Sequence, residues 1–155
     1  MLDHELAAFI ESPVMQIIGT ADADRRPEVG RGVGAWPLDG RRMAIVVSAW
    51  QWPGTVANLQ DNGMIAATFS RPSDYVTYQI KGRAEVREAA ADEIERSERY
   101  MVAMVSALMR LGIAPDIIAP WLTHREARLV TVDVASVFVQ TPGAKAGSKL
   151  WSATT

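Results

Sequence analysis

Short runs of β-branched and apolar residues, separated by turn-forming residues, recur along most of the chain. Runs of this kind are typical of strands, and the links Asp39-Gly40 and Asn62-Gly63 are typical of β-hairpins. Because hairpins join neighbouring antiparallel strands, the pattern predicts an antiparallel sheet rather than βαβ units. The predicted strands cover residues 14–20, 28–38, 43–48, 64–70, 75–87 and 129–140.

Four segments show a helical pattern instead. Asp3 is placed to cap a short helix over 3–11, and another helix is expected from Pro53 or Gly54 to about Asp61. A long helix is predicted over 89–111 and a second one over 116–124, after Pro115. The apolar stripe expected on the long helix consists of Ile94, Met101, Val105 and Leu108.

Six strands can close into a barrel and so leave no exposed sheet edge. We therefore predict a mainly β protein with helices (α+β), built on a six-stranded antiparallel barrel. The helical insert, at about 89–124, precedes the last strand. A length of 155 residues fits one domain, 1–155.

The predicted second strand is unusual because it carries Gly30, Gly32 and Gly34 at alternating positions. Glycine at such spacing relieves crowding where a barrel strand bends sharply. It also lets a backbone come close to a flat ligand or to a partner subunit. The pattern alone leaves both interpretations open, and they are compatible.

Charge and cysteine content exclude several classes of function. With 16 basic and 18 acidic residues the net charge is −2, which offers no overall attraction to nucleic acid or to an anionic membrane. The absence of cysteine excludes disulfides, thiolate catalysis and Cys-ligated metals. A cysteine-free chain with no export signal and no apolar run of roughly 20 residues is expected in the cytoplasm.

The common catalytic signatures are missing from the sequence. No glycine-rich segment matches a dinucleotide fingerprint or a phosphate-binding P-loop. His4 and His124 lack the spacing to carboxylates that a metal site needs, and we expect both at the surface. The pattern therefore predicts no metal site and identifies no catalytic residue.

The junction between the third strand and the following helix is the most suggestive segment. A helix that starts at Pro53 or Gly54 presents free N–H groups and a positive dipole end, which suit a phosphate, and Thr55 can add a hydroxyl. Trp50 and Trp52 beside it suit a flat aromatic ligand. The alternative is that these tryptophans cap the barrel or pack at a dimer interface.

The order of these features resembles the pyridoxamine 5′-phosphate oxidase-like family, the FMN-binding split barrels. The resemblance covers most of the chain outside the helical insert. No single segment is specific, and it is their order and spacing that carry the likeness. The matching segments are 27–33, 43–48, 55–59, 78–85 and 137–143, followed by Ala146-Gly147.

The resemblance implies a homodimer with two FMN sites at the subunit interface. Basic and hydroxyl side chains would hold the phosphate, a fifth-strand polar residue (Thr77 or Gln79) would face the flavin, and tail residues would come from the other subunit. The cofactor-binding residues implied in this way are Arg31, Val33, Ser48, Ala49, Trp50, Gly54, Thr55, Thr77, Gln79, Lys149 and Trp151.

One departure from the family pattern weakens the case for FMN. The family places a serine and then Arg or Lys at the start of this helix, whereas this chain has no basic residue between Ser48 and Arg71. A charge-assisted bond to phosphate contributes roughly 1.5–3 kcal/mol, so losing two would weaken FMN binding by about two to four decades.

Three functions are therefore compatible with the sequence. The first is an FMN-dependent oxidoreductase acting on a small molecule. The second is a non-catalytic barrel that binds a deazaflavin or haem, or has lost its flavin. The third is a dimeric interaction protein whose long helix offers a partner surface.

Overall fold

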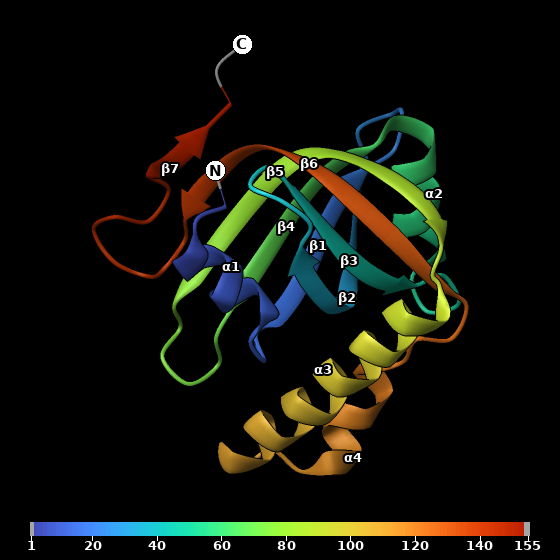
Figure 1. The fold of residues 1–155 in the computed structure, drawn as a ribbon, viewed down its shortest axis with the longest axis vertical. Helices are drawn as coiled ribbons and strands as arrows, with labels where there is room; N and C mark the ends of the chain where they lie inside the picture. Colours follow the sequence, from blue (N-terminus) through green and yellow to red (C-terminus); the bar gives the residue numbers. More distant parts are fainter. Residues whose placement is uncertain (1, 154–155) are drawn as a thin grey trace.

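Six antiparallel strands close on themselves in the structure, a computed structural model that describes residues 2–153 (Figure 1). The strand order is β3-β2-β1-β4-β5-β6, and pairing of β3 with β6 closes the barrel, which confirms the predicted fold class. The strands are β1 (Met15–Ala21), β2 (Pro27–Pro37), β3 (Arg42–Ser48), β4 (Met64–Ser70), β5 (Thr77–Glu88) and β6 (Ala127–Val139).

The helices lie where the sequence predicts them, with one shorter than expected. They are α1 (His4–Glu11), α2 (Pro53–Asn62), α3 (Ala91–Arg110) and α4 (Pro115–Ile118), which continues as the 3₁₀ turn η1 (Ala119–Trp121). The prediction of a helix over 116–124 was too long. Pro120 has no N–H to donate, so the helix tightens and ends there. None of the helices in the described residues is long and apolar enough to cross a membrane.

A short seventh strand, β7 (Lys149–Ser152), was not predicted. It pairs with the end of β6, where Val137 lies opposite Trp151. Four residues are too few to show a strand period, which explains the miss. The long β6 thus pairs with β3 along its first half and with β7 near its end.

Apolar side chains from every strand of the barrel fill its interior. Ile18, Ile45, Phe69, Ile80 and Val132 are all fully buried there. Helix α1 covers one end of the barrel with Leu6, Phe9 and Ile10, and Asp3 caps it as predicted by accepting a 2.9 Å bond from the Leu6 N–H.

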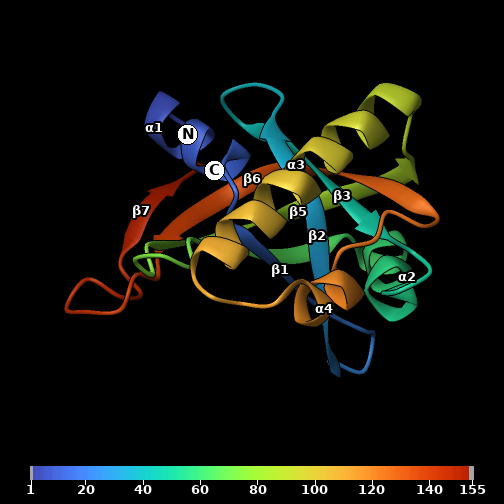
Figure 2. The ribbon, with the colours of Figure 1, turned by 90° about the horizontal axis from the view of Figure 1, so that it is seen from below.

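Helix α3 lies against the outer face of β2 and β3 (Figure 2). The Tyr100 hydroxyl donates to the Val14 carbonyl at 2.7 Å, and the Ser97 hydroxyl donates to the Val33 carbonyl. Burial raises the pKa of the Tyr100 phenol, so the phenol stays a neutral donor.

The apolar stripe of α3 is rotated from the predicted one. Leu108 is buried as expected, but Tyr100 and Met104 complete the buried stripe. Met101 and Val105 are only partly buried. The shift follows from Gly34 of β2, because the helix approaches most closely there and does so through the small Ser97.

The chain's own elements occupy the space beside the three glycines of β2. A Cβ on Gly30 would lie 2.5 Å from Oγ1 of Thr55 in α2. A Cβ on Gly34, whose φ is +138°, would lie 3.2 Å from Cα of Ser97 in α3. The strand is also irregular between Gly32 and Ala35. The sequence suggested a flat ligand or a partner subunit close to this strand. In the structure, two helices of the same chain, α2 and α3, occupy that space at Gly30 and Gly34.

Candidate functional site

The junction between β3 and α2 is covered by residues 119–126, which we call the covering segment. The Ser48 hydroxyl donates to the Arg125 carbonyl at 2.7 Å. The Gln51 side-chain amide donates to the Pro120 carbonyl at 2.6 Å. The helical insert therefore ends directly against the segment that the sequence singled out.

Two arginine–tryptophan stacks lie at this contact. The Arg31 Cζ atom, from β2, is 4.8 Å from the ring centroid of Trp121 in the covering segment. The Arg125 Cζ atom, from the covering segment, is 4.6 Å from the ring centroid of Trp50 in the junction. Within residues 2–153 neither guanidinium forms an ion pair with a carboxylate. Both charges can therefore serve an anionic, planar ligand.

Buried polar atoms that lack a hydrogen-bond partner concentrate in the same place. Four of the five such side-chain atoms among the described residues belong to the junction or the covering segment: Gln51 Oε1, Trp52 Nε1, Thr55 Oγ1 and His124 Nδ1. Unpaired buried polar atoms are rare in folded proteins and call for water or ligand. We call Arg31, Trp50, Gln51, Trp121 and Arg125 the junction site.

The first turn of α2 does not fit a flavin phosphate. Pro53, its first residue, has no N–H, and the Thr55 hydroxyl is fully buried toward Gly30. The Glu28 carboxylate lies over Gly54, with its Oε1 3.0 Å from where a Cβ would be. A phosphate here would meet a negative charge instead of the basic residue that the family pattern supplies.

Several residues that the resemblance implies as cofactor ligands are buried or hydrogen-bonded within the protein. Val33 is 1% exposed and faces α3, so its side chain cannot reach a ligand. The Ser48 hydroxyl is already bonded to the Arg125 carbonyl and accepts from the Gln51 N–H. Ala49 is partly buried, and its N–H donates to the Glu126 carbonyl at 3.1 Å.

Thr77, Gln79, Lys149 and Trp151 lie on the other side of the molecule. Gln79 donates to Thr68 at 3.1 Å, and Thr77 bonds Ser70 at 2.8 Å. Lys149 lies over the Phe138 ring, and Trp151 packs on the barrel core. Strand β7 and helix α2 are at opposite ends of the barrel in both ribbon views (Figures 1 and 2). Residues of β7 can meet a junction site only in a second copy.

Sequence reasoning missed Trp121, Arg125 and Glu28. A signal for the first two exists, because closing a barrel pairs β3 with β6. Ser48 lies opposite Ala127, so residues that follow β3 must face residues that precede β6. No comparable signal exists for Glu28, which reaches Gly54 through the approach of α2 to β2.

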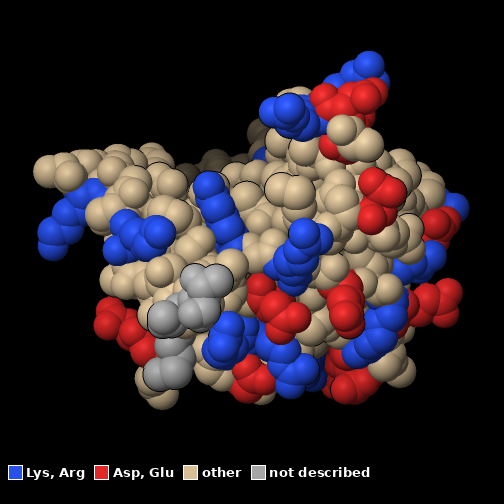
Figure 3. Space-filling view, turned by 90° about the horizontal axis from the view of Figure 1, so that it is seen from above, with Lys and Arg blue, Asp and Glu red and all other residues tan. Residues whose placement is uncertain are grey.

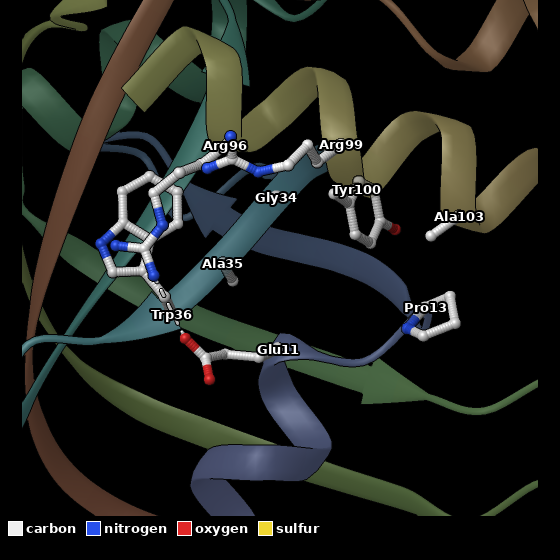
Figure 4. Close-up of a pocket in the computed structure, with 9 residues that line it drawn as sticks. All are labelled: Glu11, Pro13, Gly34, Ala35, Trp36, Arg96, Arg99, Tyr100 and Ala103. Atoms are coloured by element: carbon white, nitrogen blue, oxygen red, sulfur yellow. Dashed lines mark hydrogen bonds and ion pairs between the residues drawn. The ribbon is translucent and has the colours of Figure 1, made fainter. Parts of the chain in front are cut away.

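A second hollow, of about 270 Å³, lies between α1 and α3 above β2 (Figure 4). Both arginines that line this hollow are already paired with carboxylates. Arg96 lies 4.3 Å over the Trp36 ring and pairs with Glu11 at 3.2 Å. Arg99, at the rim, pairs with Glu95 at 2.8 Å. This hollow therefore offers less to an anion than the junction site does.

No family model and no curated protein matches the chain. Solved structures do match. HupZ from Group A Streptococcus has a TM-score of 0.59 at 20% identity, covering 95% of this chain and 100% of that one. An F420 reductase has a TM-score of 0.55 at 15% identity over 84% and 93%. HutZ, described as the heme storage protein of Vibrio cholerae, has a TM-score of 0.53 at 16% identity over 89% and 94%.

Other matching structures include candidate pyridoxamine 5′-phosphate oxidases from Lactobacillus delbrueckii and Listeria innocua. At these identities the likeness concerns the fold. The chain has the split-barrel fold of the pyridoxamine 5′-phosphate oxidase-like proteins, as the resemblance implied.

Proposed function

We propose that this protein binds a planar aromatic cofactor with an electron-rich or anionic edge at the junction site. The observation that carries this proposal is the pair of stacks, Arg31 on Trp121 and Arg125 on Trp50, formed by two arginines without carboxylate partners. A flat ring can stack on the indoles while its anionic edge meets the guanidinium groups. The unpartnered side-chain atoms of Gln51 and His124, in and beside the junction site, can fix the ring's orientation.

A flavin or deazaflavin is the first candidate for this cofactor, and an oxidoreductase acting on a small molecule is the corresponding function. The F420 reductase among the structural neighbours supports this class. When bound, such a ring supplies the redox chemistry itself. The chain then has to bind and orient the ring and shield it from water, which fits the absence of acid–base signatures. The electron-rich carbonyl edge of the ring is expected at Arg31 and Arg125, with the ribityl side chain directed toward α2.

Haem is the second candidate, and His124 favours it. Its Nδ1 atom is buried without a partner beside the junction site, and its Nε2 atom is 3.6 Å from Glu98. A histidine nitrogen is the common axial ligand of haem iron. The structural neighbour HutZ, a heme storage protein, supports this class.

We also propose that two copies pair through the outer face of β1, β4 and β5. This face carries a largely apolar hollow of about 530 Å³, lined by small residues such as Gly19, Ala21 and Ala66. Met64 is 60% exposed on it. A largely apolar exposed face suits association of two copies about a two-fold axis, which would bring Gln79, Lys149 and Trp151 toward the junction site of the other copy.

The test is a spectrum followed by a titration. Visible absorption of the purified protein distinguishes a flavin from haem, and quenching of tryptophan fluorescence reports riboflavin, FMN or haemin added to the colourless protein. Arg31→Ala and Arg125→Ala should each weaken binding, whereas Arg110→Ala, at the far end of α3, should not. A protein that takes up none of these ligands would refute the proposal.

A further inference from the structure

The side chain of Glu28 closes over the first turn of α2. Its Oε1, Cδ and Cγ atoms lie 3.0, 3.1 and 3.3 Å from the position that a Cβ on Gly54 would take. Such distances are tighter than ordinary contacts, so position 54 accommodates this carboxylate because it has no side chain. Glu28 on β2 and Gly54 on α2 are therefore complementary in shape.

The carboxylate is also complementary to α2 in charge. The N-terminus of a helix carries a partial positive charge, which a nearby carboxylate neutralises and a bound phosphate would otherwise use. Pro53 has no N–H, the Val56 N–H bonds the Trp52 carbonyl, and the Thr55 hydroxyl faces Gly30, so the backbone N–H groups of Gly54 and Thr55 are what the turn can offer a phosphate. Among described residues, no basic side chain lies in the stretch 49–70 that contains this turn.

We propose that Glu28 is a specificity-determining residue that excludes phosphate from α2, so that this chain binds a dephosphorylated flavin such as riboflavin in preference to FMN. This inference rests on the proposed function for its biological meaning. Its physical basis is local, because a carboxylate and a phosphate dianion repel each other at contact distance. In a dephosphorylated flavin, the end of the ligand that reaches α2 is a hydroxyl group, which can donate a hydrogen bond to the Glu28 carboxylate.

The test compares Glu28→Gln with the wild-type chain. The substitution keeps the shape of the side chain and removes its charge. Relative to riboflavin, FMN should bind about tenfold more tightly to the variant than to the wild type at low salt, and the gain should shrink as salt screens the charge. Glu85→Gln, which neutralises an exposed carboxylate on β5, is the matched control and should leave the ratio unchanged.

A second measurement uses inorganic phosphate alone and needs no flavin. The amide NMR signals of Gly54 and Thr55 should shift with phosphate in Glu28→Gln and not in the wild type. If no flavin binds to any variant, the proposed function fails and the phosphate titration decides this inference. Amides that stay unmoved in Glu28→Gln would overturn it, as would a wild-type chain that binds FMN more than tenfold tighter than riboflavin.

Discussion

The guanidinium of Arg125 lies over the indole of Trp50, with 4.6 Å between Cζ and the ring centroid. The two residues are 75 positions apart, and the closure of the barrel by β3 and β6 brings them together. Trp50 is 51% exposed, so a ligand can reach this stack from solvent. The Arg31–Trp121 stack is less open. The cavity beside it measures only about 10 Å³, room for one water at most.

This difference predicts unequal effects of the two arginines. Arg125→Ala should weaken binding of a planar anionic ligand about tenfold or more, since it removes a charge-assisted contact. Arg31→Ala should weaken binding less and should mainly destabilise the fold, because Arg31 packs beneath the helical insert beside a cavity with room for one water at most. Ligand titration and urea unfolding of both variants separate the two roles. Equal stability loss in both would contradict this assignment.

Replacing Gly34 should destabilise the protein through contact with α3. Gly34→Ala combines a positive φ with a Cβ 3.2 Å from Cα of Ser97, so the cost should be about 1–3 kcal/mol. Gly143→Ala is the matched control, because its φ of +141° is similar and nothing lies within 4 Å. Urea unfolding should show the larger loss at Gly34. If the free energy of unfolding falls by the same amount in both variants, backbone strain alone explains the loss. The close packing of α3 on β2 then does not contribute.

The N-terminus of α3 should lose stability in acid. The Arg87 side chain, first, and the Ala90 N–H hold the pKa of Glu93 below its ordinary value of 4.5. A carboxylate with a lowered pKa in the folded state stabilises the protein above 4.5 and loses that contribution as the pH falls through the folded value. Glu93→Gln should therefore be less stable than the wild type at pH 7. The gap should close below the folded pKa of Glu93, as measured by denaturant unfolding. A gap that is independent of pH would contradict the charge-based explanation.

The apolar face of β1, β4 and β5 predicts a dimer of twice 16.9 kDa in solution. Met64→Asp, at an exposed residue that lines the hollow in this face, should convert the dimer to a monomer, because a buried unpaired carboxylate opposes association. Val102→Asp is the control, because Val102 is 69% exposed on α3, away from this face. Sedimentation or light scattering gives the mass. A wild-type monomer would remove the interface.

The charged side chains visible from above are of both signs. On the face seen from above, basic and acidic groups are interspersed over most of the surface (Figure 3).

The barrel was predictable because its strands follow local rules. Alternation and hairpin turns fix the order of neighbouring strands, and β4 begins and ends at the predicted residues. The site was only partly predictable. Trp50 was singled out from its local setting and Arg31 through the family resemblance. Trp121 and Arg125 join them through the longest-range pairing in the barrel. Glu28 depends on how α2 rests on β2, which no local pattern encodes.

Strand β6 connects the two groups of residues that a dimer would bring together. The covering segment joins β6 at its first residue, and β7 pairs near its last residue, which comes twelve positions later. That span is about 40 Å of extended chain. One continuous strand therefore sets the distance between the covering segment and β7, the two groups of residues that would combine in a dimer. In a two-fold dimer the covering segment of one copy meets β7 of the other only if the two β6 strands run in opposite directions, so a change in the length of this strand would misalign both sites at once.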